Sequence, residues 1–224
     1  PIYYDPPPGK IKLVGVCAAT EASARKGVEQ AGYEFWCTNH RELVKRDDIN
    51  IIDCCTPMLF HAPILIDAME AGKDVYCEKP LAFNLKQAKE ILKVAKKTGV
   101  KHQIVFDNRF SPAAMKMKQL VDEGFLCDVF HFRTVYMHSG YIDPMRPMSW
   151  RLQKEIAGGG ALIDMGPHPI DFTRFLLGDF KRVYARVETF IKERPLAEKS
   201  RKVKVDVDDV ALLLLELKNG GIGY

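Results

Sequence analysis

The chain has 224 residues, of which 47% are hydrophobic and 28% are charged. This length is typical of one or two domains, and the hydrophobic share is large enough to build a core, which excludes a mainly disordered chain. With 33 basic and 29 acidic residues, the formal net charge of +4 is too small to indicate a nucleic acid or a membrane surface as partner. The apolar runs are also far shorter than the roughly 20 residues of a membrane-spanning helix.

Six cysteines are spread along the chain, and several of them lie within apolar runs. We interpret them as buried thiols of a reduced protein, which predicts a cytoplasmic location. Two cysteine–histidine pairs have the spacing of metal ligands, namely Cys37 with His40 and Cys127 with His131. Neither is accompanied by a second pair that would complete four ligands, so the sequence predicts no metal site.

Strand-like apolar segments alternate with helical segments over the first half of the chain. We expect strands at 12–17, 49–54, 74–77 and 101–106, and helices at 21–31, 60–71 and 85–98. Thr20 is placed to cap the first helix and Gly32 to end it. Apolar strands separated by helices of about a dozen residues predict βαβ units and a parallel sheet, which is the α/β class.

The pattern changes after residue 106. Further on, we expect a helix at 112–123, strands at 129–137, 182–191 and 203–217, and a glycine-rich helical segment at 158–177. Long strands with few helices between them predict an α+β domain with a largely antiparallel sheet. We place the boundary near Asn108, so that residues 1–108 and 109–224 form separate domains. The basic stretch 192–204 is interpreted as a solvated hairpin connection, with a phosphate-binding patch as the alternative.

A doubly wound parallel sheet normally opens with a strand, a glycine-rich turn and a helix that can hold a phosphate. No G-x-G-x-x-G motif occurs in this chain. The first expected strand is followed instead by Ala18 and Ala19, which is typical of the second strand of such a sheet. Since the chain also stops shortly after a long strand, we expect an internal piece of a longer protein, with a sheet that is incomplete at its N-terminal side.

Four motifs follow one another along the chain: C-T-P-M-L-F-H at 55–61, C-E-K-P-L-A at 77–82, D-N-R-F at 107–110 and G-G-G-A-L-I-D-M-G-P-H-P-I-D at 158–171. With them, the chain from about Lys10 onward resembles the Gfo/Idh/MocA family of glucose–fructose oxidoreductase, inositol dehydrogenase and their relatives. The E-K-P segment alone is a weak signal, but its combination with G-G-G-x-x-x-D-x-G-x-H is specific. The resemblance implies a partial Rossmann-like dinucleotide-binding domain at 1–108 and a partial α+β domain for substrate binding and oligomerisation at 109–224.

The resemblance also implies an activity. The expected reaction is hydride transfer between NAD or NADP and a hydroxyl-bearing carbon of a sugar, cyclitol or related polyol, in a homo-oligomer formed through the second-domain sheet. Lys79 follows a parallel strand, where ligands of open α/β sheets bind, and the resemblance implies that it contacts both cofactor and substrate hydroxyl. The bond between Lys79 and Pro80 is expected to be cis, as is common in the family.

Asp164 and His168 lie four residues apart, which places both on one face if a single helix carries them. Pro167 and the proline at 169 flank the histidine and oppose a continuous helix. A carboxylate next to an imidazole orients the ring, whose other nitrogen can take a proton. We therefore predict His168 as the general base and Asp164 as the group that orients it. Asp171 is either a supporting residue of this site or a cap for nearby backbone.

The remaining candidates are binding residues. The resemblance implies cofactor contacts from Ala18, Thr56, Pro57, His61, Glu78, Lys79 and Pro80. Ala18 stands where the family often has an aspartate for the ribose 2′-hydroxyl. Without that acid a 2′-phosphate is not repelled, and a basic residue such as Arg25 could approach it, so NADP fits no less well than NAD. Stacking and bidentate hydrogen bonds make Arg109, Tyr141, Trp150 and Arg151 candidates for a sugar pocket.

Two other functions stay open at this point. Proteins of this architecture can act as regulators that bind a nucleotide or a sugar without turnover. The combination of Lys79, Asp164 and His168 argues against a regulator, because pure binding requires no proton relay. The third alternative is an inactive, truncated chain with an exposed sheet edge that is prone to pairing.

Overall fold

The computed structural model describes residues 11–197 and 201–224, which form two compact units. The first unit takes in 11–56, Phe60–Glu78 and Leu85–Gln103. The second takes in the remaining described residues, including Pro57–Leu59 and Lys79–Asn84 from the first half of the chain. Two short segments that follow strands of the first unit are therefore packed in the second unit.

The strands of the first unit form two small sheets. β1 (Gly15–Cys17) pairs in parallel with β2 (Phe35–Cys37), and a second sheet has the order β3 (Ile51–Cys54), β4 (Asp74–Cys77) and β5 (His102–Ile104). β3 and β4 are parallel, with Cys54 opposite Cys77. A doubly wound sheet has the strand order 3-2-1-4-5-6. In that order, β2 and β1 correspond to strands 3 and 2, and β3, β4 and β5 correspond to strands 4, 5 and 6. The predicted parallel α/β architecture is confirmed.

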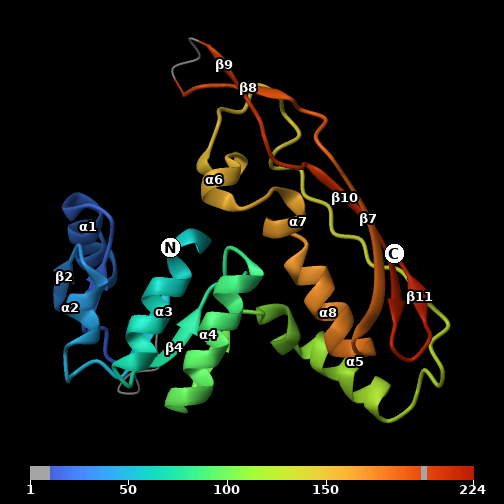
Figure 1. Cartoon of the computed structure of the whole chain (residues 1–224), viewed down its shortest axis with the longest axis horizontal. Coiled ribbons are helices and arrows are strands. Elements are labelled where there is room, and N and C mark those ends of the chain that lie inside the picture. Colours follow the sequence, from blue (N-terminus) through green and yellow to red (C-terminus); the bar gives the residue numbers. More distant parts are fainter. Residues whose placement is uncertain (1–10, 198–200) are drawn as a thin grey trace. The chain divides into compact units, whose positions relative to one another are not determined.

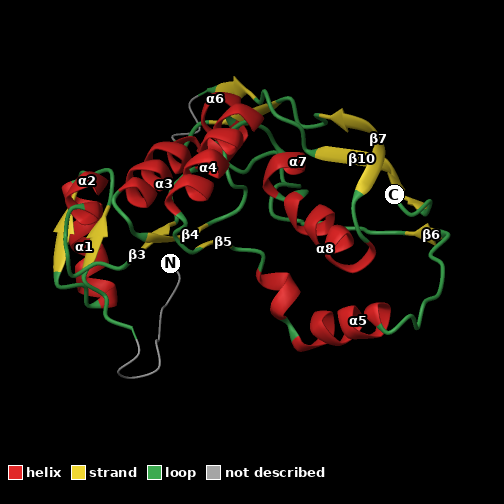
Figure 2. Ribbon diagram, turned by 60° about the horizontal axis from the view of Figure 1, so that its bottom comes forward, coloured by secondary structure: helices red, strands yellow, loops and turns green. Residues whose placement is uncertain are grey.

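Four helices connect these strands: α1 (Glu21–Ala31), α2 (His40–Val44), α3 (His61–Glu70) and α4 (Leu85–Thr98). The Thr20 side chain accepts a hydrogen bond from the Ser23 amide, and Gly32 ends α1 at φ 74°, so both predicted end signals of this helix are confirmed. α3 packs on β3 and β4 with α4 beside it (Figure 2). Their contact faces supply much of the core of this unit, including Leu65, Ala68, Met69, Val75, Ile91 and Ala95.

The second unit contains an antiparallel ladder and several helices (Figure 1). The helices are α5 (Pro112–Asp122), α6 (Lys154–Ala157), α7 (Ala161–Asp164) and α8 (Pro167–Leu177), with single 3-10 turns at Met58–Phe60, Asp107–Phe110 and Trp150–Leu152. The main sheet has the order β6 (His131–Phe132), β11 (Ile222–Gly223), β10 (Val210–Leu217) and β7 (Phe180–Glu188). β10 is antiparallel to both of its neighbours, whereas β11 and β6 are parallel. The predicted largely antiparallel sheet is confirmed.

Several element predictions for the second half are wrong in detail. Only His131–Phe132 of the strand expected at 129–137 is paired. The strand expected at 203–217 is two strands, β9 (Lys202–Lys204) and β10. β9 pairs with β8 (Glu193–Pro195) as the expected hairpin, but this connection is not wholly solvated. Arg194 is only 1% exposed, because its guanidinium donates hydrogen bonds to backbone carbonyls in the 141–146 segment.

Among the described residues, no helix combines the length and the apolar character that a bilayer crossing requires.

Candidate active site

The lysine of the E-K-P motif is the best-defined part of the site. Lys79 comes two residues after the end of β4, and the peptide bond between Lys79 and Pro80 is cis, as expected. The Lys79 ammonium donates hydrogen bonds to Asp164, at 3.0 Å to Oδ1 and also to the backbone carbonyl. The Lys79 side chain is 14% exposed and that of Asp164 is 43% exposed. A mostly buried cation is thus held beside a carboxylate that still reaches solvent.

A second cation lies on the other oxygen of the same carboxylate. Arg151 Nε is 3.8 Å from Asp164 Oδ2, and its guanidinium lies 4.4 Å from the centre of the Trp150 ring. Trp150 as a whole residue is 37% exposed. The structure therefore brings Trp150 and Arg151 to the Lys79–Asp164 pair, as a sugar-binding role for them would require.

The three glycines of the G-G-G motif form a turn that Asp208 holds. The Asp208 carboxylate accepts hydrogen bonds from the amides of Gly160, at 2.9 Å, and Leu162, at 2.7 Å. Its backbone carbonyl accepts a third from Ala161. A Cβ on Gly160 would lie 1.8 Å from that carbonyl oxygen, so the close approach requires glycine. This turn starts α7, which ends at Asp164. Sequence reasoning missed Asp208, although the pattern V-D-V-D-D at 205–209 marks a carboxylate-rich loop.

Asp164 and His168 are not on one helix. α7 ends at Asp164 and α8 begins at Pro167, so the helical segment is interrupted next to the prolines that were expected to oppose a continuous helix. The polar contacts of Asp164 described above go to Lys79 and Arg151. His168 lies in the first turn of α8 with a buried Nδ1 atom, and its ring centre is 5.9 Å from that of Tyr136. Orientation of His168 by Asp164 stays a prediction.

Arg109 and Asp171 form an ion pair with each other. Arg109 Nε donates to Asp171 Oδ2 at 2.7 Å, and Nη2 donates to Oδ1. Asp171 is only 8% exposed, and the guanidinium also lies over the rings of Phe106 and Phe175. This bidentate pair ties the 3-10 turn before α5 to α8. The geometry favours a structural role for both residues over the predicted sugar contact by Arg109 and the predicted backbone cap by Asp171.

Tyr141 packs into a small core of the second unit. Its side chain contacts the buried cluster of Leu152, Val205 and Val207. The Arg146 guanidinium stacks on its ring at 4.2 Å, and its hydroxyl lies 3.5 Å from Ser149 Oγ. Most of the aromatic ring is thus used by packing within the chain, and a substrate contact by Tyr141 stays a prediction.

Three of the residues predicted to contact the cofactor lie at the carboxyl ends of strands in the first unit. Thr56 follows β3, Glu78 follows β4, and the Glu78 amide donates to the Cys54 carbonyl at 2.9 Å. Ala18 follows β1, and its amide donates to the Cys37 carbonyl at 3.2 Å. Strand ends of this kind are where open α/β sheets bind ligands. His61 differs from the others because its ring is buried, at 1% exposure, so a direct cofactor contact by that ring is not supported.

Comparison with known protein families accounts for nearly the whole chain. Residues 3–106 match the oxidoreductase family described as an NAD-binding Rossmann fold, and residues 114–224 match the GFO/IDH/MocA C-terminal domain. The chain belongs to the Gfo/Idh/MocA family. The E-K-P and G-G-G segments on which the resemblance rests are the segments that the Lys79–Asp164 contact joins.

Similar proteins include named sugar dehydrogenases. Levoglucosan dehydrogenase of Pseudarthrobacter phenanthrenivorans is 34% identical over all of this chain and 60% of its own length. D-xylose dehydrogenase of Paenarthrobacter nicotinovorans is 30% identical over 90% of this chain and 52% of its own length. A solved structure of levoglucosan dehydrogenase with NADH has a TM-score of 0.90 and 36% identity, over 95% of this chain and 56% of that protein. The chain thus spans little more than half the length of these relatives.

Proposed function

We propose that the protein is an NAD(P)-dependent oxidoreductase that transfers a hydride between nicotinamide and a hydroxyl-bearing carbon of a sugar, cyclitol or related polyol. The contact between Lys79 and Asp164 carries this proposal, because it joins two motifs 85 residues apart into one charged site. Similar proteins named for levoglucosan, D-xylose and inositol support the substrate class. We further propose that residues 1–108 serve cofactor binding and residues 109–224 serve substrate binding.

Lys79, His168 and Asp164 have different roles in the proposed reaction. The Lys79 ammonium donates a hydrogen bond to the substrate hydroxyl oxygen and stabilises the negative charge that develops there. His168 takes the hydroxyl proton as general base. Asp164 positions Lys79, and its predicted role in orienting His168 is kept as part of this proposal. A bound nicotinamide would supply the hydride acceptor, held by Thr56, Pro57, Glu78, Pro80 and Ala18.

The carboxyl end of β1 bears on the choice between NAD and NADP. Ala18 presents no carboxylate there that would repel a 2′-phosphate. Arg25 is an exposed cation of α1, paired with Glu21 at 2.8 Å and stacked on Trp36 at 4.7 Å. We propose that either cofactor is accepted, with Arg25 as the candidate partner of a 2′-phosphate. The expectation of buried thiols is met by Cys37, Cys54 and Cys77, whereas Cys55 and Cys127 are exposed. A reducing, cytoplasmic compartment is kept as part of the proposal.

Cofactor binding and turnover are tested together. We expect calorimetric titration with NADH and NADPH to give micromolar binding of at least one of them. The oxidised cofactor is then mixed with levoglucosan, D-xylose or myo-inositol in turn. We expect the absorbance of the reduced nicotinamide to increase with at least one of these substrates. Binding of a dinucleotide or sugar without turnover of any polyol would support the regulator. No binding at all would support the inactive chain.

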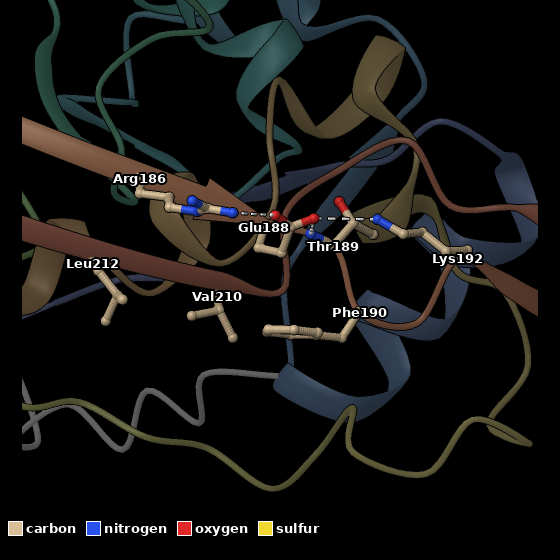
Figure 3. A pocket seen from close by; sticks show the side chains of 7 residues that line it. All are labelled: Arg186, Glu188, Thr189, Phe190, Lys192, Val210 and Leu212. Carbon is tan, nitrogen blue, oxygen red and sulfur yellow. Dashed lines mark hydrogen bonds and ion pairs between the residues drawn. The ribbon is translucent and has the colours of Figure 1, made fainter.

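The main sheet of the second unit has an exposed apolar face. By the pairing register, Tyr184, Leu212, Leu214 and Ile222 point to the same side, and each is at least 58% exposed. Where β7 ends and β10 begins, this face has a pocket of about 270 Å³. Seven residues line it, among them Phe190, Val210 and Leu212 (Figure 3). The register places Arg186 and Glu216 on the same side, so large apolar and charged side chains share this face. Because groups of exposed large apolar side chains mark interaction sites, we propose that this face forms the homo-oligomer interface that the family resemblance implies.

The oligomer proposal is tested on the sheet face itself. We expect light scattering coupled to gel filtration to show a dimer or larger species, and Leu214→Arg to shift the mass to that of a monomer, because it places a charge in the interface. Leu85→Arg is the matched control, since Leu85 is a 70% exposed leucine outside the sheet. A wild-type monomer, or an unchanged mass for Leu214→Arg, would contradict the proposal.

A further inference from the structure

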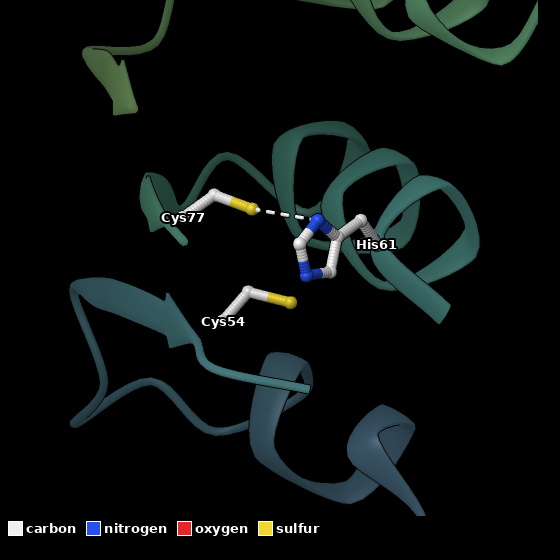
Figure 4. Close-up of side chains that lie close together, drawn as sticks. All are labelled: Cys54, His61 and Cys77. Carbon is white, nitrogen blue, oxygen red and sulfur yellow. Dashed lines mark hydrogen bonds between the residues drawn. The ribbon is translucent and has the colours of Figure 1, made fainter. Parts of the chain in front are cut away.

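Three potential metal ligands that the proposed reaction does not use meet inside the first unit. Cys54 is the last residue of β3, Cys77 is the last residue of β4, and His61 is the first residue of α3. Their two sulfur atoms and one ring nitrogen all lie within 4.8 Å of one another (Figure 4). All three side chains are buried, at 2% exposure or less. Each comes from a different element, so the fold alone brings them together.

Hydrogen bonding orients the histidine as a ligand. His61 Nε2 lies 2.9 Å from the carbonyl oxygen of Thr56, and a carbonyl can only accept. Nε2 therefore carries the ring hydrogen, and in the neutral ring Nδ1 carries the lone pair, 3.4 Å from Cys77 Sγ. Metal-binding histidines characteristically donate their second ring N–H to a carbonyl or carboxylate, which fixes the tautomer in this way.

Both thiols have polar neighbours in this buried cluster. The Cys77 sulfur lies 3.2 Å from the Glu78 carbonyl oxygen and 3.4 Å from His61 Nδ1, and the Cys54 sulfur lies 3.5 Å from the Thr56 hydroxyl. A divalent cation that replaces the two thiol protons would bind both sulfur atoms and the ring nitrogen. The two thiolates would neutralise its charge in this buried place.

We propose that Cys54, His61 and Cys77 form a binding site for a thiophilic divalent cation of the zinc type. A sulfur and a nitrogen bound to one tetrahedral zinc ion, at about 2.3 and 2.1 Å, lie about 3.6 Å apart. The 3.4 Å between Cys77 Sγ and His61 Nδ1 is close to that separation. The Thr56 hydroxyl, 3.5 Å from Cys54 Sγ, is an oxygen donor at the same cluster. Binding forms two metal–sulfur bonds and one metal–nitrogen bond and releases the thiol protons of Cys54 and Cys77 to solvent.

Such a site would clamp the region that precedes the proposed cofactor contacts. Cys54 stands two residues before Thr56, and Cys77 directly precedes Glu78. A metal bound here links β3, β4 and α3 at the carboxyl edge of their sheet. Because the folded chain assembles the ligands and the unfolded chain does not, bound metal stabilises the folded state. We therefore expect zinc to raise the unfolding temperature of this protein.

Cobalt is the probe for ligand identity. The reduced, chelator-treated protein is incubated with Co²⁺, both as folded chain and during refolding, since the site is buried. We expect one Co²⁺ per chain, a thiolate-to-cobalt charge-transfer absorption, and displacement of Co²⁺ by Zn²⁺. Cys54→Ser and Cys77→Ser are expected to lose the stoichiometric ion and the absorption. Cys55→Ser is the matched control, because Cys55 is the exposed neighbour of Cys54, and it is expected to retain both.

Two further measurements decide the case if the serine variants do not fold. X-ray absorption of the zinc-loaded wild-type protein is expected to show two sulfur neighbours and a histidine nitrogen. Thermal unfolding with zinc is expected to shift upward in wild type and in Cys55→Ser alike. Three outcomes would each overturn the proposal. They are a metal coordinated by oxygen and nitrogen atoms only, a wild-type protein that binds no metal, and a Cys54–Cys77 disulfide in place of a metal site. None of these readouts depends on dehydrogenase activity.

Discussion

Replacing His168 by alanine is expected to lower kcat by about 10²–10⁴-fold, the usual contribution of a general base. Without the imidazole, the substrate proton must pass to water, whereas the groups proposed to hold the dinucleotide are untouched. Calorimetric affinity for the preferred cofactor is therefore expected to stay within about twofold of wild type. The measurements are initial rates with the best substrate of the panel and a titration of the same preparation.

His102→Ala is the control for this experiment, because His102 is an exposed histidine in β5 outside the proposed site. Its kcat is expected to match wild type. Full activity of His168→Ala would refute its role as the base. Asp164→Asn separates the two roles considered for Asp164. If Asp164 positions Lys79, we expect Asp164→Asn to lower kcat and also to weaken substrate binding. If Asp164 orients His168, we expect Asp164→Asn to alter the pH profile of kcat.

The sequence predicts local structure well where end signals are explicit. The bounds of α1, α4 and β4 match the expected ranges, because capping residues or glycines mark the ends of the helices and β4 is a short apolar run between turns. β2 and α2 were not predicted, since three and five residues are too few to show a periodic pattern.

Long-range contacts explain most of the differences between expectation and structure. The stretch 203–217 is largely apolar and resembles one long strand, yet the carboxylates of Asp206, Asp208 and Asp209 bind amides of distant segments and interrupt the ladder there. These carboxylates have no partner within their own segment, so no local pattern indicates their role. The strand that follows them, β10, pairs only where the acidic residues end.

The candidate site shows the same division between local and distant information. Motif spacing identified Lys79, Asp164 and His168 as one group, but local spacing suggested a link between the last two. The fold also connects Asp164 to a lysine 85 residues away, which no local spacing indicates. The cluster of Cys54, His61 and Cys77 was missed for the same reason. Metal-ligand spacing within one segment was the signal sought, whereas these ligands come from two strands and a helix.

Gly160→Ala is expected to destabilise the second unit by about 3 kcal/mol, because the added Cβ cannot coexist with the Asp208 carbonyl 1.8 Å away. The backbone must move, and this weakens or breaks the three hydrogen bonds that Asp208 accepts from the backbone amides of Gly160, Ala161 and Leu162. For a chain of this size we expect the unfolding midpoint to fall by roughly 10 °C, measured by circular dichroism or calorimetry.

The same turn also starts the helix that ends at Asp164, so its displacement reaches the proposed site. Gly160→Ala is therefore expected to lower kcat as well as stability, even though residue 160 is not proposed to touch substrate. Gly27→Ala is the matched control: it lies within α1, where alanine is favoured by about 1 kcal/mol, and its Cβ meets only the Val16 side chain at 3.2 Å. Asp208→Asn, which keeps one acceptor oxygen, should cost about 1.5–3 kcal/mol. If Gly160→Ala is as stable as Gly27→Ala, the turn yields without cost, and the glycines of this motif serve substrate access instead of the Asp208 clamp.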